Sequence, residues 1–165
     1  MDLVDELAAG WAREHPKLAT ETLNPLVRLH RIAIRLESFE RDVVTAYGLA
    51  PSDSRVLALL RRVGRPYRMS PSALYGRLSR SSGGMTKILK RLEEAKWIER
   101  VPDPNDGRGL LVGLTREGLV LQDRVFTAFL AASRELFAPL SPAKLREVDR
   151  ALRTLQDALE RDPSD

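Results

Sequence analysis

The chain contains no cysteine among its 165 residues, and this absence excludes several kinds of chemistry. Disulfides, thiolate zinc sites, iron–sulfur clusters, cysteine nucleophiles and thiol redox switches all require that residue. No apolar run approaches the roughly 20 residues of a membrane helix, and the acidic first residues do not resemble a signal peptide. With 43% hydrophobic and 30% charged residues, the chain is not disordered either. We therefore expect a soluble, cytoplasmic protein of one domain, without a membrane partner.

Motifs of common enzymes are missing as well. The sequence has two histidines, far apart and without HExxH spacing, and no GxSxG, P-loop or dinucleotide fingerprint. Asp103, Asn105 and Gly107 match part of a calcium-binding loop. However, the glycine falls at the wrong offset, and Leu114 takes the place of the bidentate glutamate. The sequence therefore predicts no enzyme, no metal site and no cofactor.

Positive charge is concentrated in the middle of the chain. Residues 55–100 carry twelve basic and three acidic side chains, a net charge of +9, whereas the whole chain has +4 and the remainder therefore −5. A basic segment between two acidic arms favours a module that binds a polyanion such as nucleic acid. The alternative is a charged, solvated surface without a partner.

The N-terminal part predicts two helices. Apolar residues at helical spacing indicate an amphipathic helix over residues 2–15. Asn24 and Pro25 then provide the cap and the first turn of a longer helix, which ends at Gly48.

The C-terminal part predicts two more helices. Thr115 caps one that runs to about Phe137, and Ser141 with Pro142 begins the last one, whose apolar residues alternate spacings of three and four. Such a seam packs against another helix, either in an antiparallel hairpin within the chain or across a homodimer. We favour the homodimer, because the helices at both ends need a shared core that the basic segment is too small to provide. The residues assigned to dimerisation are Leu26, Leu29, Leu145, Val148, Leu152, Leu155 and Leu159.

Residues 49–114 predict a small DNA-binding module. Two short helices, over residues 52–63 and from Ser70 onward, precede a longer helix that Ser81 or Ser82 caps. Two apolar runs on either side of the turn sequence PDPNDGRG then indicate a β-hairpin. Short helices, a turn and a hairpin in this order are typical of a winged helix-turn-helix.

The longer helix has the features of a recognition helix, which enters the major groove of DNA. Its exposed first turns carry Thr86, Lys87 and Lys90, our candidates for base contacts. Gly83 and Gly84 lower helix propensity but allow the backbone to approach a phosphate closely; the alternative is a loose helix start without a role. Further candidates for contacts to DNA are Ser70, Arg77, Arg80, Ser81, Ser82 and Arg91. The predicted inward stripe is Met85, Ile88, Leu89, Leu92 and Ala95.

Arg108 lies near the tip of the predicted hairpin, between Asp106 and Gly109. An arginine at such a tip can enter the minor groove of DNA. Asp106 is expected to orient it through a charge-assisted hydrogen bond. We therefore assign Arg108 to DNA binding and Asp106 to support of the wing.

The segment from Tyr67 to Gly118 contains a series of short motifs, most specific in RLEEAKWIERVPDPNDGRGLLVGLTREG. The motifs are an RLE sequence at the end of the recognition helix, DP.D.R in the wing and LT..G at the start of the next helix. In these motifs, and in the order of elements along most of the chain, the sequence resembles the MarR family of bacterial transcription regulators. The resemblance implies a homodimer joined by N- and C-terminal helices, a pseudo-palindromic operator, and release by a small, often aromatic anionic ligand. The matching residues are Arg91, Leu92, Glu93, Arg100, Asp103, Pro104, Asp106, Arg108, Leu114, Thr115 and Gly118, with Arg100 expected to support the wing.

The N-terminal helix with Trp11 and the segment PYRMSPSALYGRLSRSSGGMT are similar to the subgroup of this family that senses urate and related phenolics. Two of that subgroup's usual ligand residues, an acid and an arginine, are replaced by Arg55 and Ile88, so we do not predict urate as the ligand. We still expect a pocket between the N-terminal helices and the basic module, close to Trp11, His15, His30 and Arg55. The alternative for each histidine is an ordinary packed or surface residue.

The expected fold is mainly α with a small β-hairpin wing. Residues 1–48 hold N-terminal dimerisation helices and a pocket wall, residues 49–114 the winged helix-turn-helix, and residues 115–165 the C-terminal dimerisation helices. The expected function is a homodimeric, sequence-specific regulator of transcription, acting as a repressor, that binds double-stranded DNA and is released by a small molecule. The alternative is an interaction protein of the same fold that sequesters another regulator without binding DNA.

Overall fold

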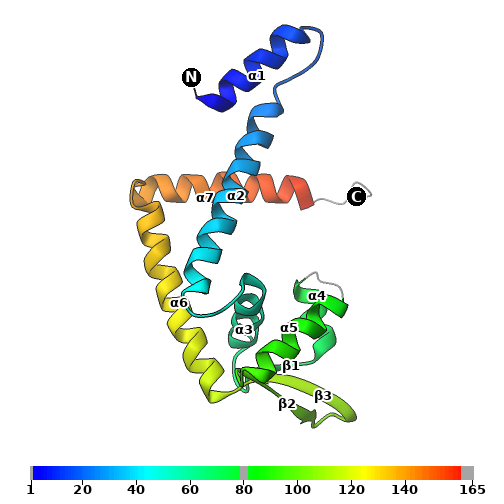
Figure 1. The fold of residues 1–165 in the computed structure, drawn as a ribbon. Helices are drawn as coiled ribbons and strands as arrows, with labels where there is room; N and C mark the ends of the chain where they lie inside the picture. Colours follow the sequence, from blue (N-terminus) through cyan, green and yellow to red (C-terminus); the bar gives the residue numbers. More distant parts are fainter. Residues whose placement is uncertain (1, 79–81, 161–165) are drawn as a thin grey trace.

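The computed structural model describes residues 2–78 and 82–160 and confirms a mainly helical fold with a small sheet (Figure 1). The described helices and strands are α1 (Leu3–Glu14), α2 (Leu23–Thr45), α3 (Pro51–Arg62), β1 (Arg68–Met69), α4 (Pro71–Leu78), α5 (Ser82–Glu94), β2 (Ile98–Asp103), β3 (Asp106–Leu114), α6 (Arg116–Phe137) and α7 (Pro142–Glu160). Helices α3 to α5 and the sheet form one end of the molecule, while α1, the first half of α2 and α7 lie at the other. Within the described ranges, no helix combines the length and apolar content of a membrane crossing.

The predicted hairpin is confirmed, and its strands reach further towards the turn than the apolar runs alone indicated. Strands β2 and β3 pair antiparallel from Ile98 and Leu114 up to Asp103 and Asp106, with an irregularity in register after Pro102. Strand β1 pairs with the other edge of β3, which gives the order β1-β3-β2. The hairpin is thus anchored by a third strand next to the helices.

The main hydrophobic core lies among α3, α4, α5 and the sheet, with contributions from the end of α2 and from α6. Met85, Ile88, Leu89 and Leu92 of α5 are buried in it as the stripe predicted, but Ala95 follows the helix and is exposed. The remaining members are Val44, Leu49, Val56, Leu57, Leu59, Leu60, Met69, Leu74, Ile98, Val112, Leu114 and Val125.

The start of α2 differs from the prediction. The helix begins at Leu23, and its N-cap residue is Thr22, whose side chain makes no capping hydrogen bond. Asn24 was expected to be the cap, but it lies inside the first turn, and its side-chain oxygen is buried without a hydrogen-bond partner in the described structure. A turn closed by the hydrogen bond from the Leu23 N–H to the Thr20 carbonyl (3.1 Å) leads directly into α2, so the helix begins before Asn24.

Helix α1 docks on the first turns of α2 through one arginine. The Asp2 carboxylate caps α1 by accepting hydrogen bonds from the backbone N–H groups of Val4 (2.9 Å) and Asp5 (3.1 Å). Arg28 of α2 donates to both Asp2 and Asp5, the latter at 2.7 Å. The Arg28 guanidinium, together with the backbone donors, lowers the pKa of Asp2 to about 2. The contact therefore persists at all but strongly acidic pH.

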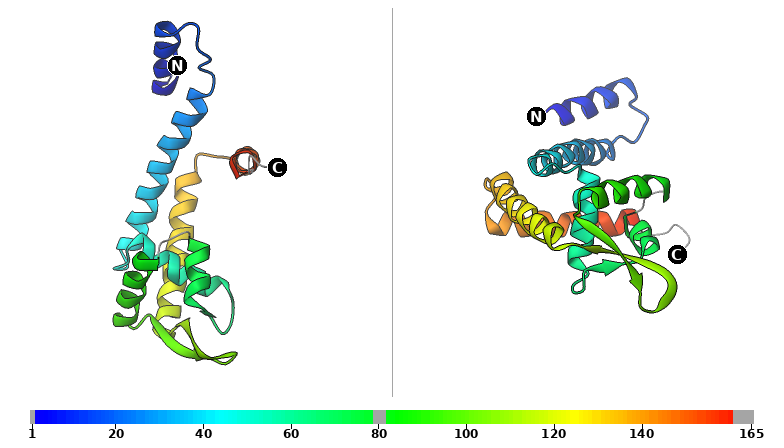
Figure 2. Two further views of the ribbon diagram at one scale, coloured as in Figure 1. Left: turned by 90° about the vertical axis from the view of Figure 1, so that its right-hand side faces the viewer. Right: turned by 60° about the horizontal axis from the view of Figure 1, so that its bottom comes forward.

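Helix α7 has no buried residue. In Figure 1 it overlaps α2, but Figure 2 shows it end-on and standing away from α2. Its seam residues Leu145, Leu152 and Leu159 are 39%, 47% and 67% exposed. An antiparallel helical hairpin within the chain, the alternative to a dimer, is therefore not what the structure contains.

Candidate nucleic-acid interface

The exposed face of α5 carries the residues predicted to contact bases. Gly84, Thr86, Lys87 and Lys90 are all exposed, on the side opposite the buried stripe. The Lys90 ammonium lies 3.8 Å from Glu94 one turn later, in a solvent-exposed pair that leaves the lysine available to a phosphate. Helix α5 thus combines one buried and one basic, exposed face, as a recognition helix requires.

Several predicted DNA-binding residues are only partly visible. Arg80 and Ser81 lie outside the described residues. Ser82 and Gly83 belong to α5, and Arg108 belongs to β3, but the described part of the structure does not include the side chains of Ser82 and Arg108 or the exposure of Gly83.

Ser70 and Arg77 occupy the two ends of α4. Ser70 is half-buried, and its hydroxyl accepts a hydrogen bond from the Ala73 backbone N–H at 3.3 Å, so its visible role is to cap the helix. Arg77 is exposed in the last turn. Of these two residues, Arg77 has the exposure that contact with a phosphate requires.

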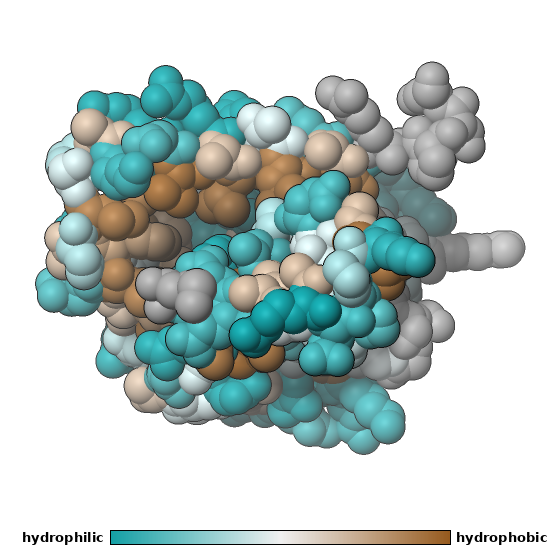
Figure 3. All heavy atoms as spheres, turned by 90° about the horizontal axis from the view of Figure 1, so that it is seen from above, coloured by the Kyte–Doolittle hydropathy of each residue, from teal (hydrophilic) through white to brown (hydrophobic). Residues whose placement is uncertain are grey.

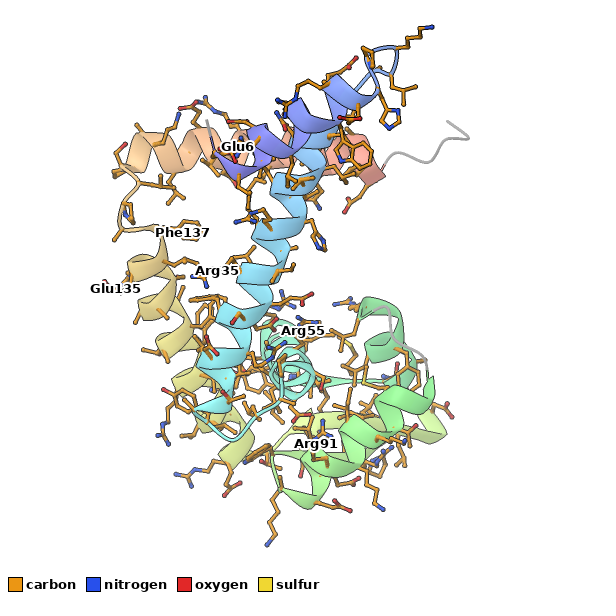
Figure 4. All side chains as sticks on the ribbon, turned by 45° about the horizontal axis from the view of Figure 1, so that its top comes forward. Glu6, Arg35, Arg55, Arg91, Glu135 and Phe137 are labelled. Carbon is orange, nitrogen blue, oxygen red and sulfur yellow. The ribbon has the colours of Figure 1, made fainter. Side chains whose placement is uncertain are left out.

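Arg91 was also predicted to contact DNA, but its guanidinium is held by a buried carboxylate. Arg91, labelled in Figure 4, donates to Asp53 at the start of α3, from Nε to Oδ2 at 3.1 Å and from Nη2 to Oδ1. The Asp53 side chain is 3% exposed and also accepts from the Ala50 backbone N–H at 3.1 Å. Hydrogen bonding to Asp53 raises the pKa of Arg91 above its ordinary value. Arg91 therefore helps to attach α5 to α3, and its side chain, which is 51% exposed, remains a candidate for contact with DNA.

The wing is tied to the recognition helix and to the third strand. Arg100 of β2, which was predicted to support the wing, donates to Glu93 at the end of α5 (3.2 Å). Arg68 of β1 lies 3.5 Å from Glu99 across the sheet. Asp106 packs at the tip, where a Cβ added to Gly109 would lie 3.0 Å from its Oδ2. These contacts limit movement of the hairpin relative to α5.

The connection from the hairpin to α6 is tightly packed. Thr115 caps α6 as predicted, accepting from the Gly118 N–H at 3.0 Å, and its hydroxyl donates to the Lys96 carbonyl at 2.7 Å. The Thr115 N–H donates to the Trp97 carbonyl at 3.1 Å. Gly118 lies so close to this carbonyl that a Cβ on it would be 1.9 Å from the oxygen. Glycine is therefore required at this position.

A cavity of about 630 Å³ lies between α2, α3 and α6, with one lining residue from α4. Arg55, one of the four predicted pocket residues, lines it. The other lining residues are Glu40, Val44, Ser54, Ala58, Arg61, Arg62, Leu78, Gln122, Asp123, Val125, Phe126 and Phe129. Its volume is in the range typical of small-molecule sites.

The structure does not bring the other predicted pocket residues to this cavity. Trp11 and His15 stack on each other at the end of α1, with ring centroids 5.5 Å apart, and His30 is exposed on α2. None of these three lines the cavity. Elsewhere in the described residues, histidine, aspartate and glutamate side chains form no group of three that could hold a metal ion.

Two ion pairs on the cavity wall connect α3 to the long helices. Arg55, labelled in Figure 4, donates from Nε to Glu40 of α2 at 2.9 Å, and Arg61 donates to Asp123 of α6 at 2.8 Å. Arg61 also lies over the Tyr67 ring, 5.0 Å from its centroid. These hydrogen bonds raise the pKa values of both arginines. The cavity thus borders the contacts that join the basic module to its helical arms.

Asp53 and Gln122 were missed by the sequence analysis. Asp53 stands third in a helix that begins with proline, which is a signal for capping, but nothing local indicates its bond to Arg91 38 residues later. Gln122 is a polar residue on the apolar face of α6. A polar residue at such a position departs from the helical pattern, and this departure could have indicated a functional residue.

Comparisons with known sequences agree with this arrangement. A family model described as MarR family matches residues 47–109. The HTH-type transcriptional regulator PecS of Dickeya dadantii is 32% identical over 138 residues, which are 84% of this chain and 83% of that protein. The multiple antibiotic resistance protein MarR of Salmonella typhimurium is 33% identical over 110 residues, which are 64% of this chain and 74% of that protein.

Solved structures of MarR proteins resemble this chain in fold. AbsC, a MarR family transcriptional regulator from Streptomyces coelicolor, aligns with a TM-score of 0.71 and 28% identity, over 87% of this chain and 97% of its own. A cysteine-to-serine variant of MarR from E. coli, complexed with operator DNA, aligns with a TM-score of 0.67 and 26% identity, over 79% and 93%. The likeness to PecS spans most of both chains, and the chain therefore belongs to the MarR family of transcriptional regulators.

Proposed function

We propose that this regulator binds a pseudo-palindromic operator as a homodimer and represses transcription from it. The observation that carries the proposal is α5, with Thr86, Lys87 and Lys90 exposed on one face of a helix whose other face is buried. Residues 49–114 would bind DNA, and residues 1–48 and 115–165 would hold the dimer together. The expected compartment is the cytoplasm, and we expect no catalytic activity.

The two recognition helices of a dimer would enter successive major grooves, about 10 base pairs apart. The start of α5 offers backbone N–H groups for a phosphate, and Lys87 and Lys90 are within reach of bases or backbone. Arg108 in the wing would enter the flanking minor groove. For α5 and Arg108 to bind at the same time, the hairpin must keep its position relative to α5. The hydrogen bond from Arg100 to Glu93 supports this position.

Operator binding is expected to depend strongly on salt and on Arg108. In a gel shift with the DNA upstream of its own gene, the association constant should fall steeply with salt concentration, because bound lysines and arginines release counterions. Arg108→Ala should weaken specific binding by about 1–3 kcal/mol at fixed salt. The matched control is Arg153→Ala, which removes the same charge from the exposed face of α7.

Three outcomes separate the alternatives. A sequence-selective, salt-sensitive shift excludes the interaction protein that sequesters another regulator. Absence of a shift with every fragment would refute DNA binding. An unchanged affinity of Arg108→Ala would remove the wing from the mechanism.

The homodimer is supported by apolar residues that one chain leaves exposed. Figure 3 shows a band of hydrophobic residues across the end of the molecule that holds α1 and α7, bordering a hollow. Leu152 and Leu145 of α7, Leu26 of α2 and Leu7 of α1 are among the exposed residues at this end. Patches of this kind on soluble proteins are typical of interfaces.

Leu152→Glu should convert the dimer to monomers, because it would bury a charge in the seam. Sedimentation should then give a mass of 18.5 kDa, and operator affinity should fall with it. Thr154→Glu, which adds the same charge to an exposed position of α7, should remain a dimer. A wild-type protein that sediments as a stable monomer at micromolar concentration would refute the dimer.

The cavity supports release by a small aromatic or anionic effector. Its walls combine phenyl and aliphatic groups with Arg55 and Arg61. An anionic group bound there would compete with Glu40 and Asp123 for these arginines and loosen α3 from α2 and α6. Because α3 also holds α5, such a ligand would favour a different position of the recognition helix.

A further inference from the structure

Gln122 of α6 has a buried acceptor that the protein does not satisfy. The residue is 4% exposed, and its side-chain oxygen Oε1 has no hydrogen-bond partner in the described structure. The same side chain lines the cavity between α2, α3 and α6. A buried polar atom is unfavourable unless something donates a hydrogen bond to it. A molecule in the cavity, either water or a ligand, would supply this donor.

The neighbouring side chains do not supply that donor. Val125, Phe126 and Phe129 line the cavity on the same helix and have no polar side-chain atoms. Arg55 and Arg61 direct their N–H groups to the carboxylates of α2 and α6. A ligand that fills the cavity thus meets apolar walls, the paired Arg55 and Arg61, and the unpaired side-chain oxygen of Gln122. Ser54 and Arg62 also line the cavity.

We propose that Gln122 selects the effector by accepting a hydrogen bond from it. The ligand of this cavity then carries an O–H or N–H donor in addition to a ring or acidic group, and its analogue without the donor binds more weakly. A water molecule is the other donor that can occupy the position, and an apolar ligand would displace it without replacing the bond. The inference rests on the effector cavity of the proposed function.

The test is calorimetric titration of the full-length protein, without DNA, with two probes that differ in one donor. The probes are 4-hydroxybenzoate and benzoate. Wild-type protein should bind 4-hydroxybenzoate about tenfold more tightly or better, since benzoate leaves Oε1 without its bond. In Gln122→Met, which keeps the size of the side chain and removes the acceptor, the two affinities should become nearly equal.

Gln156→Met is the matched control, because it makes the same change at an exposed position of α7 and should keep the wild-type preference. The comparison of the two probes on wild-type protein needs no variant and stays informative if Gln122→Met is poorly folded. Equal affinities in wild type, a preference that persists in Gln122→Met, or no binding of either probe at millimolar concentration would each overturn the proposal. Operator binding by the ligand-free protein tests the proposed function separately.

Discussion

Replacing Gly118 with alanine is expected to lower the free energy of unfolding by about 3 kcal/mol or more. The added Cβ would lie 1.9 Å from the carbonyl oxygen of Trp97, far inside van der Waals contact. The oxygen belongs to the backbone, so no side-chain rotation can relieve the clash. It also accepts the Thr115 N–H, and movement of either strand or helix would break the cap of α6.

The measurement is urea denaturation of the variant beside wild type. Gly10→Ala and Gly76→Ala are matched controls, because an added Cβ at these helical positions meets no atom within 4 Å. Each control should gain up to about 1 kcal/mol, since alanine favours helix over glycine. If Gly118→Ala were as stable as the controls, the close approach of α6 to the hairpin would be wrong.

Replacing Arg91 with methionine should cost about 2–4 kcal/mol, because the buried carboxylate of Asp53 loses its charged partner. The Asp53 carboxylate keeps the hydrogen bond from the Ala50 N–H. The loss of stability should therefore be smaller than for a buried charge without any partner. Operator affinity should fall as well, since α5 loses its ion pair with α3 and keeps only its apolar contacts to that helix.

Urea denaturation of a double-mutant cycle checks this assignment. Asp53→Asn in the Arg91→Met background should recover part of the stability, because no unpaired charge remains. Lys90→Met is the control on the same helix. It removes a lysine from an exposed pair, with an expected cost below about 0.5 kcal/mol. Weaker operator binding by Arg91→Met without any loss of stability would return Arg91 to a direct contact with DNA.

Much of the fold could be predicted from the sequence, because the local signals agree with the tertiary structure. Thr115 caps α6, the stripe on α5 is buried except at Ala95, and the hairpin forms around its turn sequence. The predicted start of a helix is less accurate where a residue favourable for capping is preceded by another hydrogen-bonded turn. Asn24 is the example: it is a favourable cap residue, but the hydrogen-bonded turn from Thr20 to Leu23 begins the helix before it.

In the candidate sites too, features set by one helix were predictable, and features set by contacts between helices were not. The exposed lysines of α5 follow from helical periodicity, so their face was predictable. The partner of Arg91 and the lining of the cavity depend on how α2, α3 and α6 meet, which no short segment encodes. Trp11, His15 and His30 were expected beside Arg55 in a pocket between the N-terminal helices and the basic module, but none of the three lines the cavity that Arg55 lines.

Two nearby residues of helix α3 form ion pairs with two different helices, the recognition helix α5 and the long helix α2. Asp53 binds the recognition helix, and Arg55, two residues later, binds α2 beside the cavity. A regular helix transmits a tilt along its axis without refolding, so occupancy of the cavity would reach α5 by rigid-body motion. Such motions take microseconds to milliseconds. The response to an effector would then be fast compared with the dissociation of a tightly bound operator, and ligand binding could act on the protein while it is still on DNA.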